Sequence, residues 1–223
     1  MENKNILTQA DIEDEIRRAE MEKREVDFNG KVLSSFSFQQ RVIEGNLNLN
    51  RTIILGPVYL ESTTIKGNLN LNQAIIRGTF YFGAGNLEGD LNFQEGNVKG
   101  VVNLVGARIR GSLNFQGLNV AGFLSLAKAQ IERDVNLQNS KINDAYHSGL
   151  IVKGDVYLRE AIISGNLNVE NSFIEGSLDT MGTFIGGNAD LRGIQINEIL
   201  ILKSSRIKGN LVLEKAKYQE LVK

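Results

Sequence analysis

Few side chains in this sequence could carry chemistry, and they do not cluster. His147 is the single histidine, and Asp144, three residues before it, is the nearest carboxylate. A catalytic site needs a nucleophile or base held within reach of a partner group, and no such pattern surrounds this pair. The sequence has no cysteine, which excludes thiolate nucleophiles, thiolate metal sites and disulfides. We therefore predict no catalytic residue, no cofactor and no enzymatic activity.

Carboxylates are the remaining metal ligands to consider. Four aspartates are expected to face outward, namely Asp134, Asp155, Asp179 and Asp190. A calcium-binding β-roll would repeat the pattern G-G-x-G-x-D, and only the fragment GGNAD at 186–190 comes near it. No metal site is predicted.

Composition excludes further classes of function. The 223 residues carry 25 Lys and Arg against 26 Asp and Glu, a formal net charge of −1, whereas a general nucleic-acid binder would show a basic excess. No apolar run is long enough to span a membrane, and the first residues, MENK, lack the apolar segment of a secretory signal. A cytoplasmic location is expected.

An eleven-residue repeat dominates the chain. Its first position is aliphatic from Ile43 to Ile142 and again from Val152 to Ile207, and its third is Gly except at Arg133, Asp144 and Glu198. The fifth and seventh positions are Leu, Val or Phe in most units, and the tenth is mostly small. One residue is lost from the count at 142–151.

The repeat predicts short strands that wind into a solenoid. Apolar residues at the fifth and seventh positions share one face of an extended segment. The glycine marks a corner that needs either positive φ or close backbone approach. An eleven-residue helical period is excluded, because a glycine in each unit would cost a helix about 1 kcal/mol.

Charges at the second position predict two units per coil. In alternate units this position alternates in sign, in the series Glu44, Lys66, Glu88, Arg110, Glu132, Lys153 and Glu175. A coil of three units would instead place Arg77 over Arg110, which repel. The sixth and eighth positions of the same units are Asn and Gln, which could form hydrogen-bonded ladders. Each coil should consume 22 residues.

The segments Ala74–Gly78 (AIIRG) and Leu47–Arg51 (LNLNR) resemble the unit of the pentapeptide-repeat family. Each eleven then contains two such fives and one extra residue, and the resemblance covers roughly residues 26–217. It implies an all-β fold, a right-handed four-sided parallel β-helix (solenoid) with about 22 residues per coil. The family's roles are diverse. One of them, a DNA mimic that binds a type II topoisomerase, requires an acidic surface, and here the Glu series is offset by Lys and Arg.

The ends of the solenoid are expected to differ. Residues 1–25 should form a cap whose α-helix, from Thr8 to about Arg24, is N-capped by Thr8 and buries Ile12, Ile16 and Ala19. Repeats fill 26–217, irregular at 142–151, and 218–223 form a C-terminal tail. A partner-binding helix at the N-terminus, and a kink that presents His147, are the functional alternatives to a lid and a tolerated irregularity.

Two surfaces could bind partners. One is an outward apolar and aromatic patch that includes Tyr59, Tyr81, Val101 and Phe123, although exposed strands favour such residues anyway. The other is a set of outward apolar residues in the last coils, Ile199, Ile201 and Val212, which either mediate self-association or lie under the folded-back tail. The sequence thus predicts a non-catalytic structural or protein-interaction solenoid, forming a homodimer or higher assembly, with an unknown protein partner, no direct nucleic-acid contact and no membrane span. The alternative is the DNA mimic.

Overall fold

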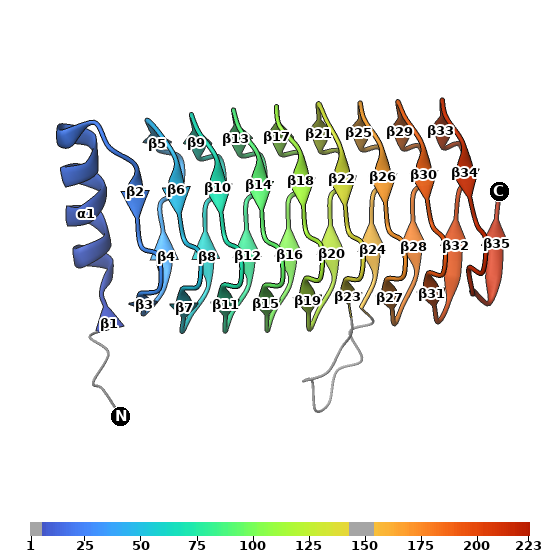
Figure 1. Ribbon diagram of the computed structural model, residues 1–223, viewed down its shortest axis with the longest axis horizontal. Coiled ribbons are helices and arrows are strands. Elements are labelled where there is room, and N and C mark those ends of the chain that lie inside the picture. The colour runs from blue at the N-terminus through green and yellow to red at the C-terminus, as the bar shows by residue number, and fades with distance from the viewer. Residues whose placement is uncertain (1–5, 143–153) are drawn as a thin grey trace.

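The computed structural model describes residues 6–142 and 154–223, which form a parallel β-solenoid closed at one end by a helix (Figure 1). About nine coils of roughly 22 residues stack along the rod, and their strands line up into four sheets, here called walls A to D. The predicted fold class is confirmed.

Each wall contains every strand of one register. Wall A is formed by β1 (Ile6–Leu7), β3 (Val32–Leu33), β7 (Ile53–Ile54), β11 (Ile75–Ile76), β15 (Asn97–Val98), β19 (Asn119–Val120), β23 (Lys141–Ile142), β27 (Phe173–Ile174) and β31 (Gln195–Ile196). Wall B is formed by β2 (Val26–Asp27), β6 (Leu47–Asn48), β10 (Leu69–Asn70), β14 (Leu91–Asn92), β18 (Leu113–Asn114), β22 (Val135–Asn136), β26 (Leu167–Asn168), β30 (Ala189–Asp190) and β34 (Leu211–Val212). Wall C is formed by β4 (Phe36–Ser37), β8 (Val58–Tyr59), β12 (Phe80–Tyr81), β16 (Val102–Asn103), β20 (Leu124–Ser125), β24 (Val156–Tyr157), β28 (Leu178–Asp179), β32 (Ile199–Ile201) and β35 (Glu220–Val222). Wall D is formed by β5 (Val42–Ile43), β9 (Thr64–Ile65), β13 (Asn86–Leu87), β17 (Arg108–Ile109), β21 (Gln130–Ile131), β25 (Ile162–Ile163), β29 (Phe184–Ile185) and β33 (Arg206–Ile207).

The chain visits the walls in the order D, B, A and C, as β5, β6, β7 and β8 show. Wall B therefore lies opposite wall C, and wall A lies opposite wall D. This order decides which surface residues can share a face.

The interior is filled by the apolar repeat positions. Ile65, Leu69 and Leu71, at the first, fifth and seventh positions of one unit, are fully buried, and each such side chain stabilises the fold by about 1.5–3 kcal/mol. Phenylalanines interlock across the rod: the ring of Phe93 from wall B lies edge-on to Phe80 from wall C, with ring centroids 5.7 Å apart. Small tenth-position residues such as Thr63 are buried as well.

Two kinds of corner separate the strands. At the ninth position the backbone is left-handed, with φ of 60° at Gln73 and 67° at Gly106. At the third position the glycine is needed for space instead: a Cβ on Gly89 would lie 2.1 Å from Asn68 Oδ1 and 2.7 Å from the oxygen of Gly67. Of the two reasons expected for the repeated glycine, close approach to the preceding coil is the correct one.

The fourth position explains that close approach. Its side-chain oxygen accepts a hydrogen bond from the backbone N–H of the fourth position one coil later, as in Asn68 N to Asn46 Oδ1 and Asp90 N to Asn68 Oδ1, both 2.8 Å. Two described units lack the glycine, at Arg133 and Glu198, and each follows a coil with a short serine at the fourth position, Ser112 or Ser177. The short side chain leaves room for a Cβ.

The predicted shortened unit at 142–151 is wrong. Leu124 pairs with Val156, 32 residues away rather than the usual 22, so the chain between β23 and β24 holds ten additional residues. Regular coils resume in register afterwards, since β22 pairs with β26. His147 and Asp144 lie outside the described residues.

This insertion limits the predicted charge series. Lys66 Nζ lies 2.8 Å from Glu44 Oε2, and Arg110 lies 4.0 Å from Glu88, as expected for coils of 22 residues. Beyond Glu132 the series is wrong, because wall D continues with Ser164, next to the paired Ile163, while Glu175 lies on wall A beside β27. Lys153 is outside the described residues.

The predicted N-terminal cap is present as α1 (Gln9–Glu22). Thr8 is its N-cap and forms a capping box with Asp11, whose pKa is lowered because its carboxylate accepts hydrogen bonds from the Thr8 backbone N–H and hydroxyl. Ile12, Ile16 and Ala19 are buried against the first coil.

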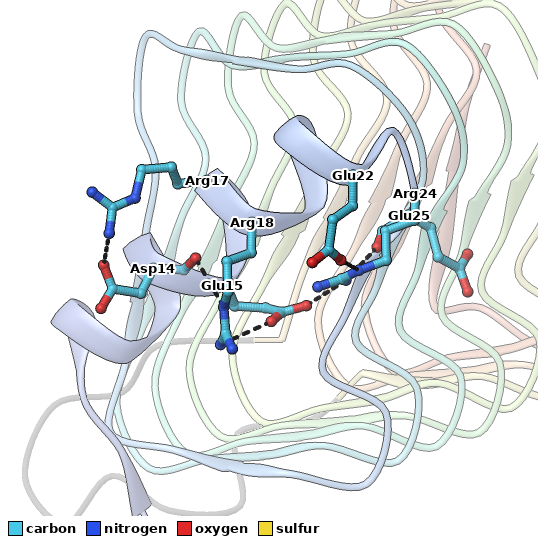
Figure 2. A network of polar contacts seen from close by, with 7 residues as sticks. All are labelled: Asp14, Glu15, Arg17, Arg18, Glu22, Arg24 and Glu25. Carbon is cyan, nitrogen blue, oxygen red and sulfur yellow. Dashed lines mark hydrogen bonds and ion pairs between the residues drawn. The ribbon is translucent and has the colours of Figure 1, made fainter.

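Ion pairs cover the outer side of the cap helix (Figure 2). Arg24 Nη1 and Nε each lie 2.6 Å from a carboxylate, those of Glu15 and Glu22, and Arg17 pairs with Asp14 at 2.7 Å. The apolar side faces the core and the charged side faces solvent, as a lid requires.

The segment 218–223, expected as a tail, contains a strand. β35 adds to the edge of β32 in wall C, with Leu200 registered against Leu221 and Ile201 against Val222. The chain therefore extends wall C at its end instead of folding over the outer face of Ile199 and Ile201.

Candidate interaction surfaces

The predicted partner surface lies on wall C. The rings of Tyr59 and Tyr81 stack with centroids 5.3 Å apart and an angle of 12°. Val101 and Phe123 come directly before β16 and β20 on the same wall, and all four side chains are half-buried. The structure brings the four residues to one face and adds Tyr157, whose ring lies edge-on to Phe123 at 6.0 Å.

Sequence reasoning missed Tyr157. Leu124 pairs with Val156 only because the inserted segment is left out of the winding, and the shortened-unit interpretation moves Tyr157 to another wall. The full patch is Tyr59, Tyr81, Val101, Phe123 and Tyr157, and we call it the wall C patch.

A polar group borders the wall C patch at Tyr157. Its hydroxyl donates a 2.7 Å hydrogen bond to Asp155 Oδ2. Asp179, almost fully buried, pairs with the guanidinium of Arg159 and accepts the backbone N–H of Met181 at 2.9 Å. Burial, followed by the hydrogen bond to Asp155, raises the pKa of Tyr157 to about 12.

Tyr157 should therefore ionise only at high pH. Because its pKa is raised to about 12 from an unfolded value of about 10, its contribution to stability is complete below about pH 10 and is lost as pH rises through 12. In a titration followed by tyrosinate absorbance, Tyr157→Phe should remove a step centred near pH 12. Tyr81→Phe should leave that step in place, and its loss in that control would contradict the assignment.

The remaining aspartates expected to face outward have structural partners. Asp134 and Asp155 accept the backbone N–H groups of Asn166 and Ser177 at 2.7 Å. Asp190 pairs with Arg192 at 2.6 Å, which lowers the pKa of its carboxyl. Within residues 6–142 and 154–223, no group of three His, Cys, Asp or Glu side chains could hold a metal ion.

The predicted self-association residues do not share a face. Ile199 and Ile201 lie on the outer side of β32 in wall C, and Val212 lies on β34 in wall B, the opposite wall. All three are half-buried. One flat contact cannot include them all.

A different apolar set lies in the last coil. Leu211 is 38% exposed, whereas Ala189 and Leu167, which precede it in the same column, are each 1% exposed. Ile207, Leu213, Tyr218 and Leu221 are likewise only partly buried against the core. These five residues, here called the last-coil set, occupy inward positions, so sequence reasoning counted them as core and did not consider that no coil of this chain covers them.

No helix in the described part of the chain is long and apolar enough to cross a membrane. Comparisons with protein-family models, with curated proteins and with solved structures gave no match. The resemblance to pentapeptide repeats therefore stays a prediction, supported by the four-sided solenoid but by no relative.

Proposed function

We propose that this chain is a non-catalytic structural and protein-interaction rod that self-associates through its C-terminal coils. The observation that carries the proposal is the last-coil set, an apolar surface that includes Leu211. Apolar surfaces at the end of a sheet, where strand edges also remain unpaired, favour association with another chain.

The difference between the two ends supports a closed dimer. At the N-terminal end α1 covers the first coil and presents its ion-paired side outward (Figure 2). At the other end β33, β34 and β35 are the outermost strands of walls D, B and C. Two copies joined by their C-terminal ends would bury like against like around a twofold axis, and this contact closes without forming a filament.

The substitution Leu211→Asp tests this contact. We expect the dissociation constant of the dimer, measured by sedimentation equilibrium, to rise at least tenfold, because a carboxylate buried in an apolar interface is strongly unfavourable. Ile75→Asp is the matched control, since Ile75 is also 38% exposed but lies on wall A in a central coil. A wild-type protein that stays monomeric throughout the micromolar range would contradict the proposal, as would equal effects of the two substitutions.

The wall C patch is the proposed surface for a protein partner other than a second copy. Its aromatic rings are held in fixed orientations by one another, which suits an interface anchor. The DNA-mimic alternative gains no comparable support, because the glutamates Glu44 and Glu88 on wall D lie beside Lys66 and Arg110. Unchanged DNA supercoiling by a type II topoisomerase in the presence of the protein would dismiss that alternative.

A further inference from the structure

Six asparagines form a flat array on wall B near the cap helix. They occupy the fourth, sixth and eighth positions of two neighbouring coils, alternating with the buried core residues of β6 and β10 (Figure 1). We call Asn46, Asn48, Asn50, Asn68, Asn70 and Asn72 the amide array. By strand geometry its members repeat about every 4.8 Å along the rod and about every 6.6 Å across it.

Every carbonyl oxygen of the amide array is used inside the protein. Five accept backbone N–H groups: Asn46 from Asn68, Asn48 from Asn50, Asn50 from Asn72, Asn68 from Asp90 and Asn72 from Gln94, at 2.8–3.1 Å. The sixth, Asn70 Oδ1, accepts from Asn92 Nδ2 at 3.0 Å. Since a backbone N–H can bond only to the oxygen of an amide, these contacts fix the orientation of the first five groups.

The amide nitrogens consequently remain available to a ligand. Within the described residues, none of the six Nδ2 atoms donates to a protein atom, and none is buried without a partner. The side chains are half-buried and held by their oxygens. Wall B thus presents a rigid two-by-three grid of N–H donors whose matching acceptors are already occupied.

A shallow hollow of about 370 Å³ continues the grid at the edge of the wall. Asn29, Asn50, Asn72 and Gln94 line one side of it, and Arg51, Gln73 and Glu95 line the other. Gln73 accepts from Arg51 Nε at 3.3 Å and donates to Glu95 at 2.9 Å, so the charges of the rim are spanned by hydrogen bonds. The hollow runs along successive coils and would follow an elongated ligand.

The chemistry of the grid excludes several occupants. A second copy would present the same donors, and two donor surfaces do not pair. A polyanion would be repelled by Asp27 and Asp90, which flank the grid in the coils on either side. A peptide would find no apolar anchor, because none of the exposed large hydrophobic side chains lies on β6 or β10.

We propose that the amide array binds an uncharged linear polysaccharide lying along the rod. Hydroxyl and ring oxygens of a sugar chain accept hydrogen bonds without carrying charge, and a regular polymer can meet a regular grid at successive residues. The inference does not depend on the proposed self-association, which uses the opposite end of the rod, so either can fail without the other.

The test uses paired substitutions that remove donors and keep the fold. In Asn50→Asp with Asn70→Asp, each new carboxylate still accepts the hydrogen bond that the amide oxygen accepted, and Asp already occupies repeat positions on this wall at Asp90, Asp134 and Asp190. The matched control is Asn86→Asp with Asn103→Asp, which makes the same change of charge on walls D and C.

Binding is measured by native electrophoresis in gels containing hydroxyethylcellulose, galactomannan or dextran, with heparin and polyglutamate as charged probes. We expect at least one linear neutral polysaccharide to retard the wild type and the control, and to bind the N50D/N70D protein at least tenfold more weakly. Side-chain NH₂ resonances of the amide array should shift when the corresponding neutral oligosaccharide is added. Failure of all the neutral probes, retardation by heparin or polyglutamate alone, or equal binding by N50D/N70D would overturn the proposal.

Discussion

Replacing Phe93 with alanine is expected to lower the free energy of unfolding by about 3–5 kcal/mol. The ring is fully buried, and it lies edge-on to Phe80 at 5.7 Å and to Phe115 at 6.0 Å. Its removal leaves a cavity that the rigid coils above and below cannot close, because each is tied to its neighbours by strand hydrogen bonds on four walls. Urea unfolding followed by circular dichroism measures the loss.

Phe184→Ala is the control for this prediction. Phe184 is half-buried on the outer side of β29, with Lys208 Nζ 5.4 Å from its ring centroid. The same deletion there should cost well under half as much, because much of the ring is already hydrated. Comparable losses for Phe93→Ala and Phe184→Ala would contradict the assignment of inward and outward positions.

Gly89→Ala should be about as damaging, with an expected loss of about 3 kcal/mol or more, for a different reason. The added Cβ would lie 2.1 Å from Asn68 Oδ1 and 2.7 Å from the backbone oxygen of Gly67. Neither atom can retreat freely, since Asn68 Oδ1 accepts the N–H of Asp90 and the Gly67 oxygen accepts the N–H of Gly89 itself. Overpacking of this kind forces the backbone to move.

The same substitution at Gly45 provides the control. Gly45 occupies the third position one coil from the start, and a Cβ there meets nothing within 4 Å. Gly45→Ala should leave stability unchanged or raise it slightly, because alanine has less conformational freedom in the unfolded chain. Adding Asn68→Ser to Gly89→Ala should recover part of the loss, as the serines that precede Arg133 and Glu198 indicate. Equal effects at Gly45 and Gly89 would contradict close approach as the reason for the glycine.

The winding was predictable from the sequence because it rests on the period of the pattern. Alternation at Leu69 and Leu71 gives the inward face, and the opposite charges of Glu44 and Lys66 give the coil length. The cap helix was predictable too, since the capping residue Thr8 and the buried stripe of Ile12 and Ile16 are local signals.

The order of walls after the insertion could not be predicted, because a period contains no phase. A ten-residue segment reads equally well as a shortened unit or as residues added between two strands, and only the pairing of Leu124 with Val156 decides. The error moved every later unit to the wrong wall, and it hid the contact between Phe123 and Tyr157.

The candidate surfaces were predicted in part. Tyr59 and Tyr81 were placed correctly because outward positions 22 residues apart must be neighbours. The last-coil set was missed, since residues such as Leu211 have the composition of core and become surface only through their place in the stack. The free donors of the amide array were also beyond the sequence, because they depend on which way each amide is turned by its backbone partner.

Disulfide cross-linking tests the 22-residue coil most directly, and the absence of native cysteines makes the result unambiguous. Asn86 and Arg108 are exposed, registered neighbours on wall D, and such neighbours lie about 4.8 Å apart, within the range that a disulfide spans. Asn119, which a coil of three units would register with Asn86, lies on the opposite wall A. Under mild oxidation the N86C/R108C protein should cross-link within each chain and the N86C/N119C protein should not. Efficient cross-linking of N86C/N119C in place of N86C/R108C would contradict the four-sided winding.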